Sequence, residues 1–396
     1  MAVVDAIGEQ AGAAPRATTR CIRSPAWDLV WILNPLWLVP LVLLLAQGHE
    51  DVRGSPVDGL FFVLTVPLWF GHRVSSAWLA YATPAYRPLL ASQKLRFVVA
   101  PLVITAACFA AMLLPESVLP MPLEERVVWL VVLDFVLVSH HFAAQHFGLL
   151  SLYRARAGRA SAPNVRRLDR WFSLVVGGGL VVLAQALTGS IAFQERWIDP
   201  WLGAAGSDLL ARMPHDGGIA LVVALAGLVL GVELRSGAPS LPRMAYVLGL
   251  AAMVLVAFLA QAPFLFIVLW SVQHWSAAMG LASLAASGGD QTATGRWQRL
   301  LAPINRRSWA VLLVLALISV LLLPVLEVEA VPDDYVYADR IFGEAAWWLR
   351  SSPFVPALLA LGFASGFIHY LLDRAAFRFS SPEVRQAARG LLKSPG

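Results

Sequence analysis

The stretch LDFVLVSHHFAAQHFGLLSLYRAR, from Leu133 to Arg156, decides the class of fold. It is apolar and long enough to cross a bilayer as a helix, which takes about 20 residues, yet it contains Asp134 and three histidines. A hydrogen-bonding group without a partner costs roughly 2 to 7 kcal/mol when it leaves water. The stretch therefore predicts a membrane helix whose polar side chains meet partners elsewhere in the chain.

The composition of the whole chain supports a membrane protein. Of its 396 residues, 58% are hydrophobic and 14% are charged, and the mean hydropathy is +0.68; soluble domains contain about 25% charged residues. We expect an all-α, polytopic bundle of about ten transmembrane helices, located in the inner membrane if the cell is bacterial. The predicted spans cover residues 26–46, 58–82, 95–114, 126–152, 170–193, 217–233, 243–261, 263–284, 308–326 and 354–376.

The charges predict the orientation of these spans. Basic and acidic connecting segments alternate: three arginines precede the first span, and the mostly acidic GHEDVRGSPVD follows it. Because positive segments stay on the cytoplasmic side, both termini are expected there. The organisation is then a cytoplasmic tail over residues 1–25, a single helical domain over 26–376 and a basic cytoplasmic tail over 377–396. The arginines in the cytoplasmic connections account for the net charge of +5, so no nucleic-acid partner is expected.

Several local features carry further expectations. Asn34-Pro35 predicts a kink in the first span, and Gln261-Ala262-Pro263 leaves so little room that residues 243–284 form either two spans or one kinked unit. The segment ERWIDPWLGAAGSDLLARM is either an interfacial helix or a loop with aromatic anchors. Gly177-Gly178-Gly179 predicts close helix packing. Two cysteines, Cys21 and Cys108, exclude a disulfide framework or a CxxC metal site.

The histidines point to a functional site. His49 and His215 fall in loops, whereas the other six lie within predicted spans. In the expected orientation their four helices all run from outside to inside, with the histidines in the cytoplasmic half. Ionisable groups within spans usually face the bundle interior and mark a site. These six are His72, His140, His141, His146, His274 and His369.

Several neutral imidazoles in an apolar cavity suit a transition metal. Asp373 follows His369 by four residues, so on a helix it lies on the same face and is a ligand, an acceptor that orients the imidazole, or a partner of Arg374 or Arg378. A structural zinc needs only four ligands, so the larger set favours two metal ions. At about 100° per residue, however, His140 and His146 lie roughly 120° to either side of His141. A straight helix therefore presents all three to the site only if a two-metal cluster is surrounded by the other helices or a π-bulge lies between His140 and His146.

Other residues are expected to support the site. One group would orient imidazoles or neutralise an anion, although snorkelling toward the headgroups is the alternative for Arg73; it comprises Asp134, Gln145, Gln273 and Arg73. A second group would line an apolar cavity for a lipid-like substrate; it comprises Trp69, Phe142, Trp275 and Tyr370. The sequence assigns no catalytic residue beyond these.

The motifs HHFAAQH and HYLLD, with isolated histidines on two further spans, resemble in arrangement the integral-membrane, histidine-rich non-haem iron enzymes, which are desaturases and hydroxylases of lipids. The resemblance covers four of the ten predicted spans, and the HxxxH and HxxHH boxes of that class are absent. It implies an oxygenase or desaturase that uses a non-haem iron centre, expected to hold two irons, to oxidise a hydrophobic substrate with dioxygen. An electron donor would then dock on the basic cytoplasmic face.

Three other functions remain open at the level of the sequence. Histidines on facing spans also ligate haem, which would make the chain an electron-transfer or quinone-reactive protein. A metal or proton-coupled transporter would need polar residues through the whole membrane thickness. The third possibility is a zinc enzyme, or a structural or assembly factor whose histidines only form hydrogen bonds.

Overall fold

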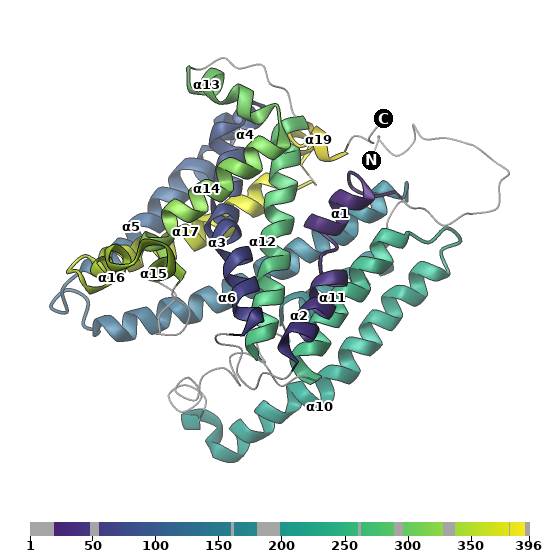
Figure 1. The fold of residues 1–396 in the computed structure, drawn as a ribbon, viewed down its shortest axis with the longest axis horizontal. Helices are drawn as coiled ribbons and strands as arrows, with labels where there is room; N and C mark the ends of the chain where they lie inside the picture. Colours follow the sequence, from purple (N-terminus) through teal and green to yellow (C-terminus); the bar gives the residue numbers. More distant parts are fainter. Residues whose placement is uncertain are drawn as a thin grey trace. The chain divides into compact units, whose positions relative to one another are not determined.

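The computed structural model describes residues 20–47, 55–159, 162–179, 199–259, 263–288, 296–327, 337–379 and 381–392. Every regular element among these residues is a helix, and none is a strand (Figure 1). The expected all-α class is therefore confirmed for the described part of the chain. Of the predicted tail 1–25, residues 1–19 lie outside the described part of the chain.

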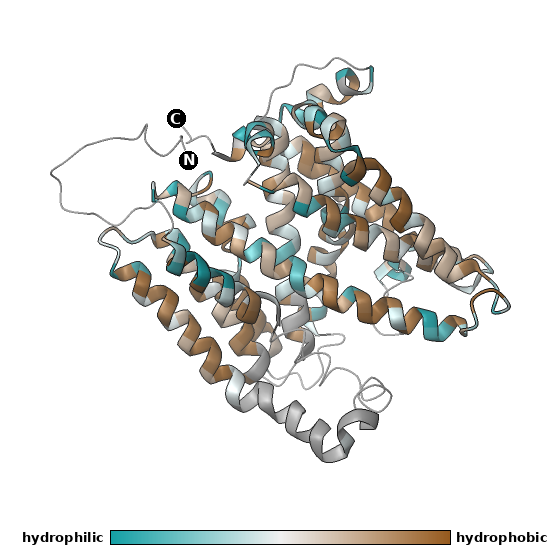
Figure 2. Cartoon of the chain, turned by 180° about the vertical axis from the view of Figure 1, so that it is seen from behind, coloured by the Kyte–Doolittle hydropathy of each residue, from teal (hydrophilic) through white to brown (hydrophobic). Residues whose placement is uncertain are grey.

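Five helical segments are long and apolar enough to cross a membrane, as a multi-pass membrane protein requires. They are Leu95–Leu113, α6 (Leu123–Arg156), the second half of α10 (Asp199–Leu234) from Gly217, α14 (Ser308–Leu326) and α17 (Val355–Ala376). The first comprises a π-helical segment, Leu95–Val99, and α5 (Ala100–Leu113). Figure 2 shows that apolar residues cover most of these helices and that hydrophilic residues gather mainly toward their ends.

The first predicted span is broken, and it brings the number of candidate spans to six if it counts as one. It consists of α1 (Pro25–Trp31) and α2 (Pro35–Ala46), which are bent by 50° relative to each other. The break falls at Asn34-Pro35, where proline cannot donate a backbone hydrogen bond. The predicted kink is confirmed.

The remaining predicted spans are helical where they are described. α3 (Pro56–Ala77) continues into a π-helical segment, Trp78–Ala82, and α11 (Leu241–Leu259) precedes α12 (Pro263–Gly288). These helices are not among the five segments; within α11, Leu241–Val256 is apolar but shorter. Residues 260–262, between α11 and α12, lie outside the described part.

The fifth predicted span, 170–193, is described only to Gly179. Here α7 (Pro163–Leu174) continues into the π-helical segment Val175–Gly179, and residues 180–198 lie outside the described part. In the segment that begins at Glu195, the residues from Asp199 onward are helical, as the first part of α10, with a break at Gly203, whose backbone angles (φ 67°, ψ 166°) are not helical. Its place at a membrane interface stays a prediction.

The described helices group into two compact units. Unit one comprises the described residues within 20–47 and 142–273, and unit two comprises those within 55–141 and 274–392. In unit one α11 packs against α2 and α10; in unit two α3 packs along α14 and against α17, which also packs along α5 (Figure 1). Short helices complete the fold: α4 (Arg87–Ser92), α13 (Arg296–Asn305), α15 (Tyr337–Phe342), α16 (Glu344–Ser351), α18 (Pro382–Ala387) and α19 (Arg389–Leu392).

A buried ionic network ties unit one together. The guanidinium of Arg243, which is 1% exposed, donates to the carboxylates of Asp169 in α7 and Glu233 in α10. Burial raises the pKa of Asp169, and the positive charges of Arg243 and Arg154 oppose that shift. Breaking a buried pair is costly because it leaves a charge without compensation. The network therefore fixes how α7, α10 and α11 pack.

Unit two depends on close backbone approach beside His72. A Cβ atom added at Gly71 in α3 would lie 2.8 Å from the backbone oxygen of Leu315 in α14. Atoms at that separation overlap, so a side chain here would push the two helices apart. Gly59, on the same helix, has open space at the corresponding position.

We predict that Gly71→Ala lowers the free energy of unfolding by about 1 to 3 kcal/mol, the usual cost of overpacking, and that Gly59→Ala does not lower it. Thermal unfolding of the purified proteins in mild detergent measures both. Equal melting temperatures for the two variants would show that α3 and α14 are not in close contact at Gly71.

Candidate metal centre

Four helices bring four histidines and one aspartate together within unit two. His72 comes from α3, His141 from α6 and His274 from α12, while His369 and Asp373 both come from α17. Each side chain is buried, with at most 7% of the residue exposed. Polar groups are rarely buried in such number without partners, so the cluster calls for a chemical explanation.

The imidazole of His72 is held by its own helix. Its Nδ1 contacts the backbone oxygen of Trp69, one turn earlier. A proton on Nδ1 satisfies this contact and leaves Nε2 as the nitrogen with a free lone pair. The ring also stacks on Trp275, with centroids 5.5 Å apart and 27° between the planes. These contacts present His72 as an Nε2 donor.

The imidazoles of His141 and His274 meet nitrogen to nitrogen, with their Nε2 atoms 3.2 Å apart. Two nitrogens bound to the same ion at about 2.0 to 2.1 Å in a tetrahedral arrangement lie about 3.3 Å apart. The observed separation is therefore that of two ligands of one ion. A hydrogen bond between the rings would occupy the same distance, with one ring as donor.

His369 and Asp373 occupy successive turns of α17. Nδ1 of His369 lies 3.7 Å from Oδ1 of Asp373 and 3.3 Å from Oγ of Ser76. Oδ2 of Asp373 lies 3.7 Å from Nε2 of His141. Within the described residues, neither Nε2 of His369 nor Oδ1 of Asp373 forms a hydrogen bond, although both atoms are buried. A metal ion would satisfy both.

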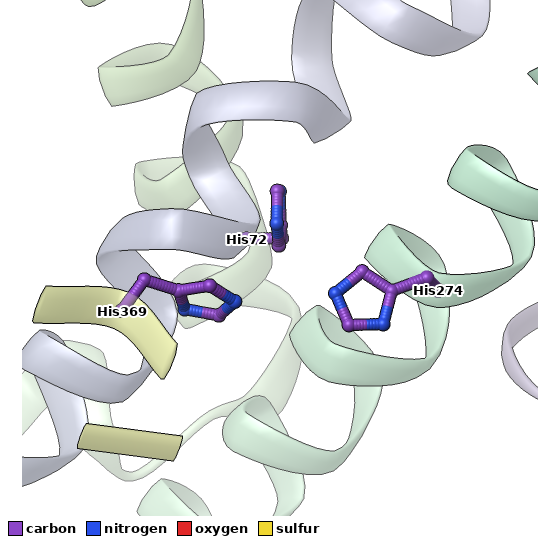
Figure 3. Close-up of side chains that lie close together, drawn as sticks. All are labelled: His72, His274 and His369. Carbon is purple, nitrogen blue, oxygen red and sulfur yellow. The ribbon is translucent and has the colours of Figure 1, made fainter. Parts of the chain in front are cut away.

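These five residues form two overlapping groups that share His369. In each group, one donor atom per residue lies within 4.8 Å of the others: His72, His274 and His369 in the first, and His141, His369 and Asp373 in the second. Figure 3 shows the imidazoles of the first group directed toward one another from three helices. Four neutral imidazoles and one carboxylate suit iron, zinc and other borderline transition metals. The donor set therefore fits such an ion.

The other two histidines of α6 are not in these groups. His140 is exposed, and His146 belongs to unit one, where its Nδ1 lies 2.5 Å from the hydroxyl of Tyr246. α6 is α-helical from Leu123 to Arg156, so no π-bulge intervenes. At about 100° per residue, a regular helix presents only His141 in the direction of the cluster.

His146 also explains one of the three consecutive glycines. A Cβ atom at Gly177 would lie 2.6 Å from Cδ2 of the His146 ring, which is fully buried. The absence of a side chain at Gly177 allows the imidazole to lie against the backbone. Close packing is thus the role of this glycine.

The predicted supporting polar residues divide between the two units. In unit two, Asp134 accepts a hydrogen bond of 3.0 Å from the Tyr370 hydroxyl, and Arg73 donates to Oγ of Ser365 at 3.1 Å. In unit one, Gln273 donates to the backbone oxygen of Ile32 at 3.4 Å, and Gln145 is half-buried. Asp134 and Arg73 therefore share a unit with the metal-ligand candidates.

Three of the four predicted aromatic residues border the cluster. Trp69 stacks with Trp275 at 6.0 Å between centroids, and the ring of Tyr370 lies 4.8 Å from that of His141. Phe142 belongs to unit one and stacks on Trp270. The three rings cover the imidazoles with apolar surface.

The sequence interpretation did not include Ser76, whose hydroxyl contacts His369. Its spacing is the available signal, because Ser76 follows His72 by four residues and so lies on the same helix face. A small hydroxyl on the face of a ligand histidine is a natural orienting group for a second histidine.

Comparison with known proteins adds no family. The chain matches no protein-family model, and no curated protein and no solved structure is similar to it.

We predict that alanine at His72, His141, His274 or His369 removes bound metal, because each change deletes a ligand. Loss of an outer-shell partner alone lowers metal affinity by about 10- to 100-fold, so the loss of a ligand should exceed that. His140→Ala is the matched control on α6 and should retain the metal. Elemental analysis of protein purified in mild detergent without chelators provides the measurement. Full metal content in the four variants would exclude this cluster as the binding site.

Proposed function

We propose that the chain is a multi-pass membrane metalloenzyme that oxidises a hydrophobic, lipid-like substrate with dioxygen at a non-haem iron centre. The observation that carries the proposal is the convergence of four buried imidazoles and one carboxylate, with the nitrogens of His141 and His274 separated by 3.2 Å. Iron supplies dioxygen activation when it binds such a donor set.

The donor set is smaller than the six histidines on which the expectation of two irons rested. His140 is exposed and His146 bonds to Tyr246, which leaves four imidazoles and one carboxylate. Donors bound to one ion at about 2.2 Å lie within about 4.4 Å of one another, yet these five residues form two groups of three rather than one group of five. The proposal therefore keeps the two irons that the sequence suggested.

The nitrogen separation also favours a non-haem ion over haem. Axial imidazoles on opposite faces of a haem iron have nitrogens about 4 Å apart, twice a metal–nitrogen distance of about 2 Å. His141 and His274 are closer than that. Their arrangement suits adjacent ligands of one ion with no porphyrin plane between them.

The residues around the centre would protect the reaction from water. Trp69, Trp275 and Tyr370 place aromatic surface beside the imidazoles, and an apolar lining also suits a hydrocarbon substrate that enters from the bilayer. The hydrogen bond from Tyr370 to Asp134 places a phenol proton near His141, where it could support proton transfer.

The proposed topology has ten spans with both termini in the cytoplasm. It rests on the alternation of basic and acidic connections and on the six candidate spans, one of them bent. In this orientation the centre lies in the cytoplasmic half of the bilayer. Hydroxylation needs two electrons and two protons for each dioxygen, to reduce the second oxygen atom to water. A cytoplasmic electron donor on the basic face would supply the electrons.

The test is isotopic and uses whole cells, because they provide the electron donor. Cells that produce the wild-type chain, His274→Ala or His140→Ala are grown under ¹⁸O₂, and their lipids are analysed by mass spectrometry. We expect lipids with one added ¹⁸O, or with two hydrogens fewer, in the wild type and in His140→Ala but not in His274→Ala. Identical lipid spectra from all three strains would rule out oxidation of cellular lipids by this centre.

A further inference from the structure

Unit two contains a second candidate site, apart from the histidines. It is an open cavity of about 350 Å³, within the range of about 300 to 1,000 Å³ that small ligands occupy. Its lining consists of Gln93, Leu95, Arg96, Ala375, Arg378, Ser381 and Val384. None of these residues belongs to the metal-ligand candidates, so the cavity has a chemistry of its own.

The lining combines positive charge with apolar surface. Arg96 and Arg378 bring two guanidinium groups to the cavity, and Nη1 of Arg96 donates to Oε1 of Gln93 at 3.3 Å. No acidic residue is among the described lining residues. Guanidinium groups recognise phosphate and carboxylate oxygens through paired hydrogen bonds. The charged side of the cavity therefore suits an anion, and Leu95 and Val384 suit a short apolar segment attached to it.

Glu383, which precedes the lining residue Val384, is the carboxylate nearest to the cavity lining in the sequence, and it has other partners. Glu383 accepts a hydrogen bond from the Ser381 hydroxyl, and the positive charge of Arg385 acts on it. Both interactions lower the pKa of Glu383, so this carboxylate is ionised and is paired locally. Arg96 and Arg378 supply the positive charge among the residues that line the cavity.

The position of the cavity along the helices indicates the source of the anion. Leu95 begins a segment that is long and apolar enough to cross a membrane, and Ala375 lies at the end of another, Val355–Ala376. The ends of spanning helices lie at the level of the lipid headgroups. Both ends also carry arginines, which the positive-inside rule places at the cytoplasmic leaflet, the leaflet rich in anionic lipids.

We propose that this cavity binds the phosphate headgroup of an anionic phospholipid, with the phosphate between Arg96 and Arg378 and the first methylenes along Leu95 and Val384. The site requires no metal. Its occupancy is therefore independent of the histidine centre, and either proposal can fail while the other stands.

The experiment compares lipid binding by the full-length wild-type protein and the double variant Arg96→Gln/Arg378→Gln. Arg374→Gln is the matched control, because Arg374 is an exposed arginine near the end of α17 that does not line the cavity. Native mass spectrometry of protein in detergent titrated with phosphatidylglycerol, phosphatidylcholine or inorganic phosphate measures each affinity. Size-exclusion chromatography verifies that all proteins remain folded and monodisperse.

We expect phosphatidylglycerol to bind more tightly than phosphatidylcholine, and the double variant to bind it about 25-fold more weakly, at about 5-fold for each arginine near a lipid surface. Arg374→Gln should bind like the wild type. Binding of inorganic phosphate as tight as that of the lipid, and lost in the double variant, would identify a soluble phosphate as the occupant of the same anion site. Unchanged affinity of the double variant for phosphatidylglycerol and phosphate would overturn the proposal.

Discussion

The structure depends on the burial of imidazoles among apolar helices. Histidine can enter such a setting because its neutral form is a strong donor to a metal and need not be buried as a charge. The Nε2 atoms of His141 and His274 lie 3.2 Å apart, a separation that fits two ligands of one metal ion as well as a hydrogen bond between the rings. In the proposed function, an ion bound here would hold the helices that carry these residues together in addition to their packing.

The packing of unit two serves this arrangement. Gly71 lets α3 approach α14 closely, and His72 follows it directly, so the helix contact and the ligand position are set by adjacent residues. On α17, His369 and Asp373 take successive turns of one face. In unit one the buried polar groups are stabilised in another way, because Arg243 pairs with two carboxylates. A buried arginine can be compensated by carboxylates. The histidine cluster is different, because its four imidazoles are accompanied by a single carboxylate.

Much of the fold could be predicted from the sequence, because hydropathy alone specifies where membrane helices lie. The span predicted at 308–326 has the same ends as α14, and the kink at Asn34-Pro35 is where the first span breaks. The residues of the candidate metal centre could be predicted less completely. Spacing correctly limited α6 to one direction, but it could not choose among His140, His141 and His146, because the choice depends on which face of α6 meets α17. The contact of Ser76 with His369 depends likewise on the packing of α3 against α17.

X-ray absorption spectroscopy on the iron-loaded protein tests the central claim most directly, because it reports the atoms bound to the metal rather than the consequences of removing them. The account predicts bound iron whose spectrum shows the multiple scattering of imidazole rings, with nitrogen ligands at about 2.0 to 2.2 Å and no porphyrin contribution. A spectrum without imidazole scattering, or one with only oxygen ligands, would contradict it, since the four buried histidines would then serve some purpose other than holding a metal.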